Sequence, residues 1–305
     1  MFINSACGKI SAEDFGVILP HEHICCYFEP YLNMAGKAYL DKEKLFEIAV
    51  GYLKEMKQNH SLCTLVDCTP TNIGRDIGLL KRISEASGVN IIPSTGFYYT
   101  TEIMMARHSE KYIENFLLYD INNNNIGIIK YAVEASEMSD FGKKTLDILC
   151  SVQKKAGLPL CIHTNAGHQN GREVLRFVLE RGVSPSAITI GHCSDTNDLS
   201  YIKEILSSGC YVGFDRIYRT DDIEYYDRMA DNIINLCENG FSDKLLLSHD
   251  NLCFNGFGDN AKIVEFNPYE VIFERLYPAL LKKGFDDKTF KKLVSENPKN
   301  MLLTK

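Results

Sequence analysis

Eight short apolar runs, each followed by polar residues, recur along the chain and constrain its fold more than any other feature. Each run is apolar or β-branched over nearly its whole length. Continuous apolar runs of this length are typical of strands buried on both faces of a parallel sheet. The runs are FGVIL (15–19), SLCTLVD (61–67), VNIIPSTG (89–96), IGIIKYAV (126–133), LPLCIHT (158–164), AITIGHC (187–193), CYVGFD (210–215) and KLLLSHD (244–250).

The segments between these runs have the periodicity of amphipathic helices. In one of them Leu45, Ala49 and Leu53 fall on a single stripe at helical spacing. Three of the segments end on a glycine that can cap a helix. The clearest predicted helices cover residues 41–58, 143–157, 172–182 and 198–209.

Eight strands that alternate with helices predict a parallel α/β fold. Eight is also the number that closes a barrel, so we predict a (β/α)8 TIM barrel formed by one domain over residues 1–305. An open doubly wound sheet fits the same count. However, LPHEH (19–23) follows the first run where a dinucleotide-binding fold would carry a glycine-rich fingerprint. The stretch 285–305 is predicted to form a helix pair broken near Pro298.

The composition argues against several classes of protein. The net charge of -7 disfavours a non-specific nucleic-acid binder, which needs a basic face. No N-terminal signal peptide and no run of 18 apolar residues is present, so no membrane partner is expected. The eleven cysteines are odd in number, form no CxxC motif and in several cases lie inside apolar runs. We therefore expect a reduced, cytoplasmic protein that acts on a small molecule.

Six ionisable residues lie at or near the ends of five of the runs. In a barrel the C-terminal ends of the strands converge on one mouth. His21 and His23 are two residues apart on a strand and face one side, and two imidazoles there suit a divalent metal. The candidate ligands are His21, His23, Lys130, His163, His192 and Asp250. The remaining histidines are interpreted as structural: His60, His108, His168 and His249.

Lys130 is the unusual member, because a buried, unpaired ammonium group is costly. A structural interpretation is a salt bridge to Glu134 or Asp67. A functional alternative is a Schiff-base lysine of a metal-free lyase. Another is a lysine carboxylated by carbon dioxide, whose carbamate can bridge two metals. The four histidines at strand ends favour the carbamate, since a Schiff-base enzyme does not need them. A non-catalytic barrel that binds a ligand at the same mouth is a further alternative.

Several stretches, in the same order along the chain, resemble the phosphotriesterase family of the amidohydrolase superfamily, including its lactonase branch. The resemblance covers nearly the whole chain and implies a (β/α)8 barrel with a binuclear metal centre at the C-terminal mouth. The matching stretches are GVILPHEH (16–23), STGFY (94–98), GIIKYA (127–132), IHTNAG (162–167), IGHCSD (190–195), VGFDR (212–216), LLLSHD (245–250) and ENPKNML (296–302).

The resemblance also assigns the ligands of two divalent ions. It implies that His21, His23 and Asp250 hold the more buried ion, and that His163 and His192 hold the more exposed one. Carboxylated Lys130 and a hydroxide would bridge them. Zinc is the first expectation, and manganese, cobalt and iron tolerate the same ligands. Two ions lower the pKa of the bridging water, and Asp250 would act as general base and then acid.

Three further residues gain expected catalytic roles from the resemblance. Asp195 stands where the family places a carboxylate that relays protons from the metal-bound aspartate. Arg216 and Tyr98 match residues of the lactonase branch, whose tyrosine lies over the bridging hydroxide. Each also has a plain structural alternative, since Arg216 could pair with Asp195 and Tyr98 could line the mouth. Asp215 is expected to orient backbone and loop rather than to perform chemistry.

The expected reaction is the opening of a lactone, either a sugar lactone, phosphorylated or not, or an acyl-homoserine lactone. The substrate pocket is expected from the loops 216–228 and 251–266. A phosphate would need a cationic clamp, for which Arg219 and Lys262 are the candidates.

An acyl chain would instead need an apolar groove, which Phe254, Phe257 and Tyr218 could supply. Hydrolysis of organophosphates or other esters at the same centre is the alternative activity. The resemblance also allows a homodimer, for which the sequence itself carries no signal.

Overall fold

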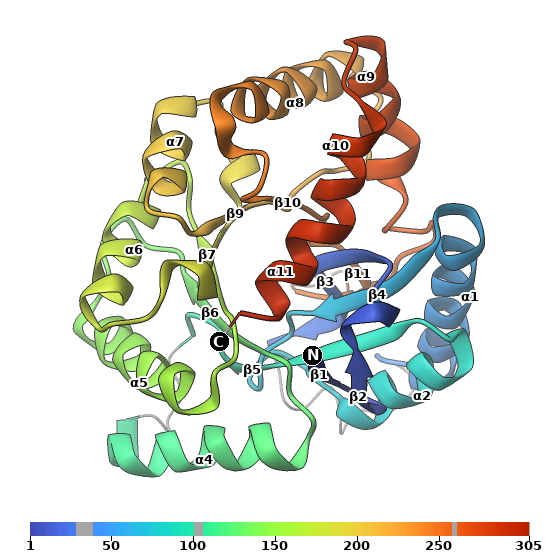
Figure 1. Cartoon of the computed structure of the whole chain (residues 1–305). Helices are drawn as coiled ribbons and strands as arrows, with labels where there is room; N and C mark the ends of the chain where they lie inside the picture. Colours follow the sequence, from blue (N-terminus) through green and yellow to red (C-terminus); the bar gives the residue numbers. More distant parts are fainter. Residues whose placement is uncertain (29–38, 101–105, 258–260, 305) are drawn as a thin grey trace.

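The computed structural model describes residues 1–28, 39–100, 106–257 and 261–304, which form a strand barrel surrounded by helices (Figure 1). All eight predicted runs form strands, and each strand pairs in parallel with the next one along the chain. The predicted (β/α)8 class is therefore confirmed. The barrel strands are β3 (Val17–Tyr27), β4 (Leu62–Asp67), β5 (Asn90–Phe97), β6 (Ile128–Val133), β7 (Leu160–Thr164), β8 (Ile188–Gly191), β9 (Tyr211–Phe214) and β10 (Leu245–Leu247).

The barrel closes through a bend in the chain after β10. The strand β10 pairs with β9, and the chain then turns at Asp250 into β11 (Leu252–Gly256), which pairs in parallel with β3. At the bend the Asp250 N–H donates to the His21 carbonyl oxygen at 3.1 Å. β12 (Lys262–Ile263) adds to β11 in the antiparallel sense. The stretch 251–266, expected as a loop, thus contains two short strands, which is a correction to the sequence-based prediction.

The helices pack around the outside of the barrel (Figure 1). The four helices predicted from periodicity are confirmed to within a few residues at each end, and α5 shows why. The Ser139 hydroxyl accepts from the Gly142 N–H at its start, and Gly157 ends it with a φ of 66°. The outer helices are α1 (Lys42–His60), α2 (Ile77–Ser87), α4 (Glu110–Asn123), α5 (Asp140–Ala156), α6 (Gly171–Glu180), α7 (Leu199–Ser207) and α8 (Ile223–Leu236).

The C-terminal tail differs from its prediction. From α10 (Asp287–Lys291) to α11 (Asn297–Leu302) the helix is continuous and not broken at Pro298. A π-helical turn over Lys292–Glu296 joins the two parts. Pro298 then falls in the first turn of α11, where a missing N–H donor is tolerated.

One end of the barrel is filled and the other is left for the site. Met301 and Leu302 of α11 join a buried apolar cluster with Ile18, Ile92 and other interior residues of the strands. The hairpin of β1 (Phe2–Ser5) and β2 (Gly8–Ser11) contributes Ile3 to the same cluster. The apolar interior therefore occupies the N-terminal end of the strands. Among the described helices, none is both long and apolar enough to cross a bilayer.

Candidate metal centre

The six candidate ligands meet at the C-terminal mouth of the barrel. His21 and His23 lie on β3, Lys130 on β6 and His163 on β7. His192 follows β8 directly, and Asp250 occupies the bend between β10 and β11. Lys130 is only 2 % exposed and His192 is fully buried. Their distribution over five strands explains how residues more than 200 positions apart come into contact.

Asp250 joins the two histidines of β3 to the rest of the group. One of its carboxylate oxygens, Oδ1, lies 3.0 Å from His23 Nε2 and 3.4 Å from His21 Nε2. The other, Oδ2, lies 3.8 Å from His192 Nε2. Burial alone would raise the pKa of Asp250, but the hydrogen bond and charge of His23 help to hold it well below its usual range. The carboxylate is therefore charged and available to a cation.

Asp215 orients two of the imidazoles. Its Oδ2 atom lies 2.6 Å from His21 Nδ1, and its Oδ1 atom lies 3.0 Å from His192 Nδ1 and 2.6 Å from the His192 backbone N–H. Because a carboxylate only accepts, both Nδ1 atoms carry the hydrogen, and both rings turn an unprotonated Nε2 toward the mouth. The expectation that Asp215 orients its surroundings agrees with these contacts, which extend to two candidate ligands.

His163 and His192 each point a ring nitrogen at the other, an arrangement that a cation between them would stabilise. His163 Nε2 lies 2.7 Å from the Glu134 carboxylate, so its Nδ1 atom carries a lone pair. This Nδ1 is 2.8 Å from His192 Nε2, which also carries one. Burial lowers the pKa of His192 to about 3, so the ring is neutral near pH 7. Two facing lone pairs repel unless a proton or a metal ion lies between them, and neutral imidazole is the form that binds metals.

Lys130 does not form the salt bridge considered from the sequence. Asp67 instead accepts the Ile24 N–H at 2.8 Å, and Glu134 binds His163. Within the described part of the chain, Lys130 pairs with no carboxylate, and its Nζ atom lies 2.6 Å from His21 Nε2. The structural interpretation is thus wrong, and the amine points at the unprotonated nitrogen of a candidate ligand.

Two of the candidate ligands have strained backbones. His192 has a φ of 64° and Asp250 a φ of 53°, in the left-handed region that non-glycine residues rarely adopt. Such conformations cost about 1–2 kcal/mol per residue and persist where the surrounding structure enforces them. Here the enforcing contacts are backbone hydrogen bonds from His192 to Asp215 and from Asp250 to His21.

Arg216 connects the cluster to Asp195. Its Nε donates to Asp250 Oδ2 at 3.0 Å, and its Nη1 donates to Asp195 Oδ2 at 2.7 Å. Arg216 therefore pairs with Asp195, as the structural alternative predicted, and it contacts Asp250 as well. Burial raises the pKa of Asp195, with Arg216 opposing the change. The two carboxylates are joined through the guanidinium group.

Tyr98 stands at the edge of the cluster. Its ring lies edge-on to His163 with 5.7 Å between the ring centroids, and its backbone N–H donates to Asn72 Oδ1 at 2.8 Å. Burial raises the pKa of the phenol, so it stays protonated and can donate a hydrogen bond.

A cavity of about 250 Å³ opens onto these groups. Phe257 and Tyr218 line it as expected, but Phe254 does not, because it is buried in the core beside β3. Of the expected phosphate clamp, Arg219 is paired with Glu270, and Lys262 is exposed on β12. The lining residues are His23, Cys26, Cys68, Ile73, Tyr98, Lys130, His163, Arg216, Tyr218, Asp250, Leu252 and Phe257.

The sequence analysis missed the partners that hold the ligands. Thr69, which lies 2.8 Å from His23 Nδ1 through its hydroxyl, carried no signal in the sequence. Glu134 was considered only as a partner of Lys130, although it binds His163. For Glu134, its position directly after a predicted strand was the one available signal.

Comparison with known proteins is consistent with this geometry. The model of the phosphotriesterase family matches residues 1–302. The chain is 30% identical to an aryldialkylphosphatase of Saccharolobus solfataricus, over 95% of this chain and 96% of the relative. It is 28% identical to a phosphotriesterase homology protein of Mycobacterium tuberculosis (98% and 97%) and 25% identical to the human N-acetyltaurine hydrolase (99% and 98%). The chain therefore belongs to the phosphotriesterase family and is a metal-dependent hydrolase of ester or phosphoester bonds.

Proposed function

We propose that this protein is a lactonase with a binuclear divalent metal centre. The observation that carries the proposal is the pair of facing, unprotonated nitrogens of His163 and His192, 2.8 Å apart beside the charged carboxylate of Asp250. In this proposal His21, His23 and Asp250 hold one ion. His163 and His192 would hold the other, and carboxylated Lys130 would be a ligand of both. Zinc is the proposed metal, because mixed imidazole and carboxylate ligands suit it.

When bound, the two ions would supply Lewis acidity toward a carbonyl group and make water acidic enough to attack near neutral pH. The residues of the chain then have separate tasks. Asp250, as a charged carboxylate, would accept a proton of the attacking water and return it to the leaving alkoxide. Arg216 fixes this carboxylate through Oδ2 and links it to Asp195, which would pass to solvent the second proton, the one released when the product acid ionises.

Tyr98 would act on the substrate rather than on the metal. Its phenol remains protonated and lines the cavity beside His163. A protonated hydroxyl at this place can donate to the oxygen of the scissile ester as negative charge develops on it. The proposal therefore assigns Tyr98 and Arg216 to lactone hydrolysis.

The cavity favours a small lactone with an apolar substituent. Ile73, Leu252 and Phe257 supply apolar walls. Arg219, the first candidate for a phosphate clamp, is already neutralised by Glu270. An acyl-homoserine lactone fits these walls better than a sugar lactone or its phosphate does.

Phosphotriester hydrolysis is the second candidate, because a relative that is 30% identical is named an aryldialkylphosphatase. The test is a specificity constant for each substrate class. Metal-free protein is loaded with zinc, and hydrolysis of lactones of several ring sizes and substituents is compared with that of paraoxon. We expect kcat/KM for one lactone class to exceed that for paraoxon at least tenfold. A higher value for paraoxon would replace the lactonase proposal by the second candidate.

The metal centre is tested separately by metal content. Protein purified without chelator is expected to hold two divalent ions per chain, measured by mass spectrometry. Carbon-13 NMR after growth with labelled bicarbonate is expected to detect a lysine carbamate that is absent from a Lys130→Met variant. Protein without bound metal would contradict the proposal whatever its activity.

A further inference from the structure

Two buried thiols lie directly below the candidate metal centre. Cys68 follows β4 and is fully buried, and Cys161 lies on β7 and is 2 % exposed. Both belong to the apolar cluster inside the barrel. They form the boundary between this cluster and the polar mouth, since Cys161 pairs in register with Lys130 and Cys68 lines the cavity.

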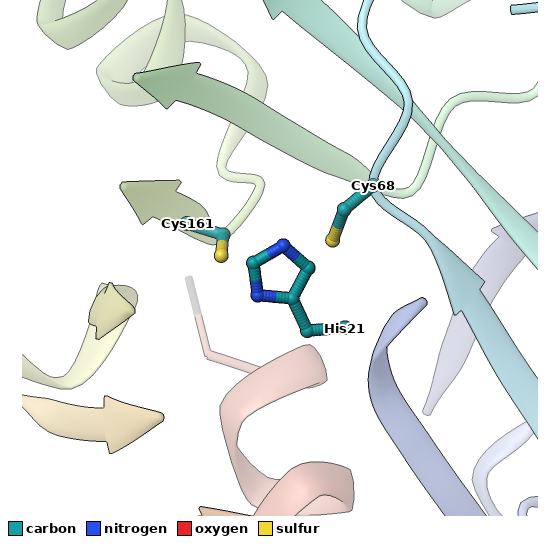
Figure 2. A group of neighbouring side chains, drawn as sticks. All are labelled: His21, Cys68 and Cys161. Atoms are coloured by element: carbon teal, nitrogen blue, oxygen red, sulfur yellow. The ribbon is translucent and has the colours of Figure 1, made fainter. Parts of the chain in front are cut away.

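The thiols share a donor set with His21. The two sulfur atoms and a ring nitrogen of His21 all lie within 4.8 Å of one another. Figure 2 shows the imidazole between the two sulfurs, with one ring nitrogen turned toward the gap between them. Because Nδ1 is bound to Asp215, the nitrogen that is free to act as a donor is Nε2.

This arrangement differs from ordinary packing of cysteines in a core. The thiols of Cys68 and Cys210 both donate to a backbone carbonyl oxygen, that of Pro20 at 3.7 Å and that of Ile205 at 3.3 Å. The difference lies in the grouping, because Cys210, although also fully buried, belongs to no such group among the described residues. Two sulfurs and an imidazole nitrogen are a donor set that zinc and other soft ions prefer. The imidazole and carboxylate ligands above them form a harder set.

We propose that Cys68, Cys161 and His21 Nε2 form a soft-metal site, which takes a strongly thiophilic divalent ion such as Cd²⁺. Binding forms two metal–sulfur bonds and one metal–nitrogen bond, and the two thiol protons pass to solvent. The ion takes the position at His21 Nε2 that the Lys130 ammonium now occupies. An ion can reach it through the cavity, which Cys68 and Lys130 both line.

The site has a consequence for catalysis that rests on the proposed function, although the site itself does not. His21 belongs both to this donor set and to the proposed binuclear centre. An ion held by the thiols therefore removes a ligand from that centre. Thiophilic ions should inhibit the enzyme by occupying this site rather than by simple exchange at the centre.

The test is a cadmium titration of the metal-free full-length protein, followed by ultraviolet absorption. We expect a thiolate-to-metal charge-transfer band that saturates at one cadmium ion per chain. The Cys68→Ser and Cys161→Ser variants should each lose most of the band and bind cadmium at least tenfold more weakly. Cys210→Ser, which removes an equally buried thiol elsewhere, should leave the band unchanged. Circular dichroism and a parallel Cys161→Ala variant control for folding.

Two results would overturn the inference. One is the absence of the band in the wild-type protein when mass spectrometry shows cadmium bound. The other is a full band in Cys161→Ser. Both are independent of the lactonase proposal, because the titration needs no turnover. Conversely, a protein that hydrolyses no lactone but shows the band would refute the proposed function and support the soft-metal site.

Discussion

The two faces of strand β3 carry buried ionisable groups in opposite situations. Glu22, between His21 and His23, points away from the mouth and is fully buried. Its Oε1 atom accepts hydrogen bonds from the Ser248 hydroxyl at 2.7 Å and from the His249 backbone N–H and Nδ1 at 2.9 and 2.7 Å. Its Oε2 atom accepts the Asn251 N–H at 3.1 Å. Every donor there meets an acceptor of the protein itself.

On the opposite face of β3, His21 and His23 look into the mouth, where the chain does not complete its own pairing. The His163 Nδ1 and His192 Nε2 atoms point their lone pairs at each other. Lys130 has no carboxylate partner among the described residues. A buried polar group without a partner is expensive, so such a face is retained where something outside the chain completes it. The hydrogen bonds around Glu22 therefore support the fold, whereas the groups at the mouth are arranged to bind an ion.

The largest effect is expected at the mouth, from His192→Ala. Removing one of the two facing nitrogens should lower kcat/KM by about four orders of magnitude, about 5.4 kcal/mol, because both the nucleophile and the Lewis acid depend on the exposed ion. Steady-state kinetics with the preferred substrate measures this. Zinc should raise the melting temperature of the wild-type protein more than that of the variant. Unchanged activity would show that the ligand assignment is wrong.

A change at Glu22, on the face of β3 away from the mouth, should lower the free energy of unfolding. Glu22→Ala leaves four buried donors without an acceptor and should destabilise the protein by about 3–5 kcal/mol, measured by urea unfolding. Glu22→Gln keeps one acceptor oxygen and should be less severe. If Glu22→Ala unfolded at the same urea concentration as the wild type, the hydrogen bonds accepted by Glu22 would not contribute to the stability of the fold.

A second internally paired network, which includes none of the candidate ligands, gives a pH prediction. Arg75 donates to both carboxylate oxygens of buried Asp120 at 2.7 and 2.8 Å. Burial alone would raise the pKa of Asp120, but Arg75 holds it below its ordinary value. A lowered pKa in the folded state stabilises the fold above the unfolded-state pKa of about 4, and this stability is lost as the pH falls through the folded-state value.

Asp120→Asn should therefore cost about 1.5–3 kcal/mol at pH 7 and progressively less below pH ~4. Urea unfolding at several pH values measures the difference. The exposed pair of Arg181 and Asp147 provides the control, since Asp147→Asn should change stability by less than ~1 kcal/mol at any pH. A difference between Asp120→Asn and wild type that does not depend on pH would contradict the assignment.

The smallest effect is expected from Glu134→Gln, which weakens the orientation of His163 without removing a ligand. The hydrogen bond from His163 lowers the pKa of Glu134 to about 2, so the carboxylate is charged at neutral pH. Loss of such a partner typically lowers metal affinity 10–100-fold, about 1.4–2.8 kcal/mol. Competition with a chelator measures it. The exposed Glu137→Gln is the control, and equal affinities in the two variants would remove Glu134 from the site.

The sequence was sufficient for the barrel because its strands are buried on both faces. Such strands read as continuous apolar runs that can be counted without knowing their partners. The same logic located the six candidate ligands, since parallel strands bring their ends together whatever the loops do.

What the sequence could not supply depends on pairing between distant segments. β11 has only three apolar residues before Asn255 and Gly256, and it becomes a strand through its pairing with β3, which also buries Phe254. Glu134 contacts His163 across neighbouring strands. Local spacing in the sequence did not show toward which residue its carboxylate would point. The left-handed backbone of His192 and Asp250 likewise arises from tertiary contacts.

The bend at Asp250 also determines when the site can exist during synthesis. His23 and Asp250 contact each other across 227 positions of the chain. The first histidines emerge from the ribosome early, and the carboxylate emerges only after most of the barrel has been made. An ion that arrives before the eighth strand would meet a partial ligand set. For a chain with this order, the complete set of candidate ligands exists only after most of the chain has been made.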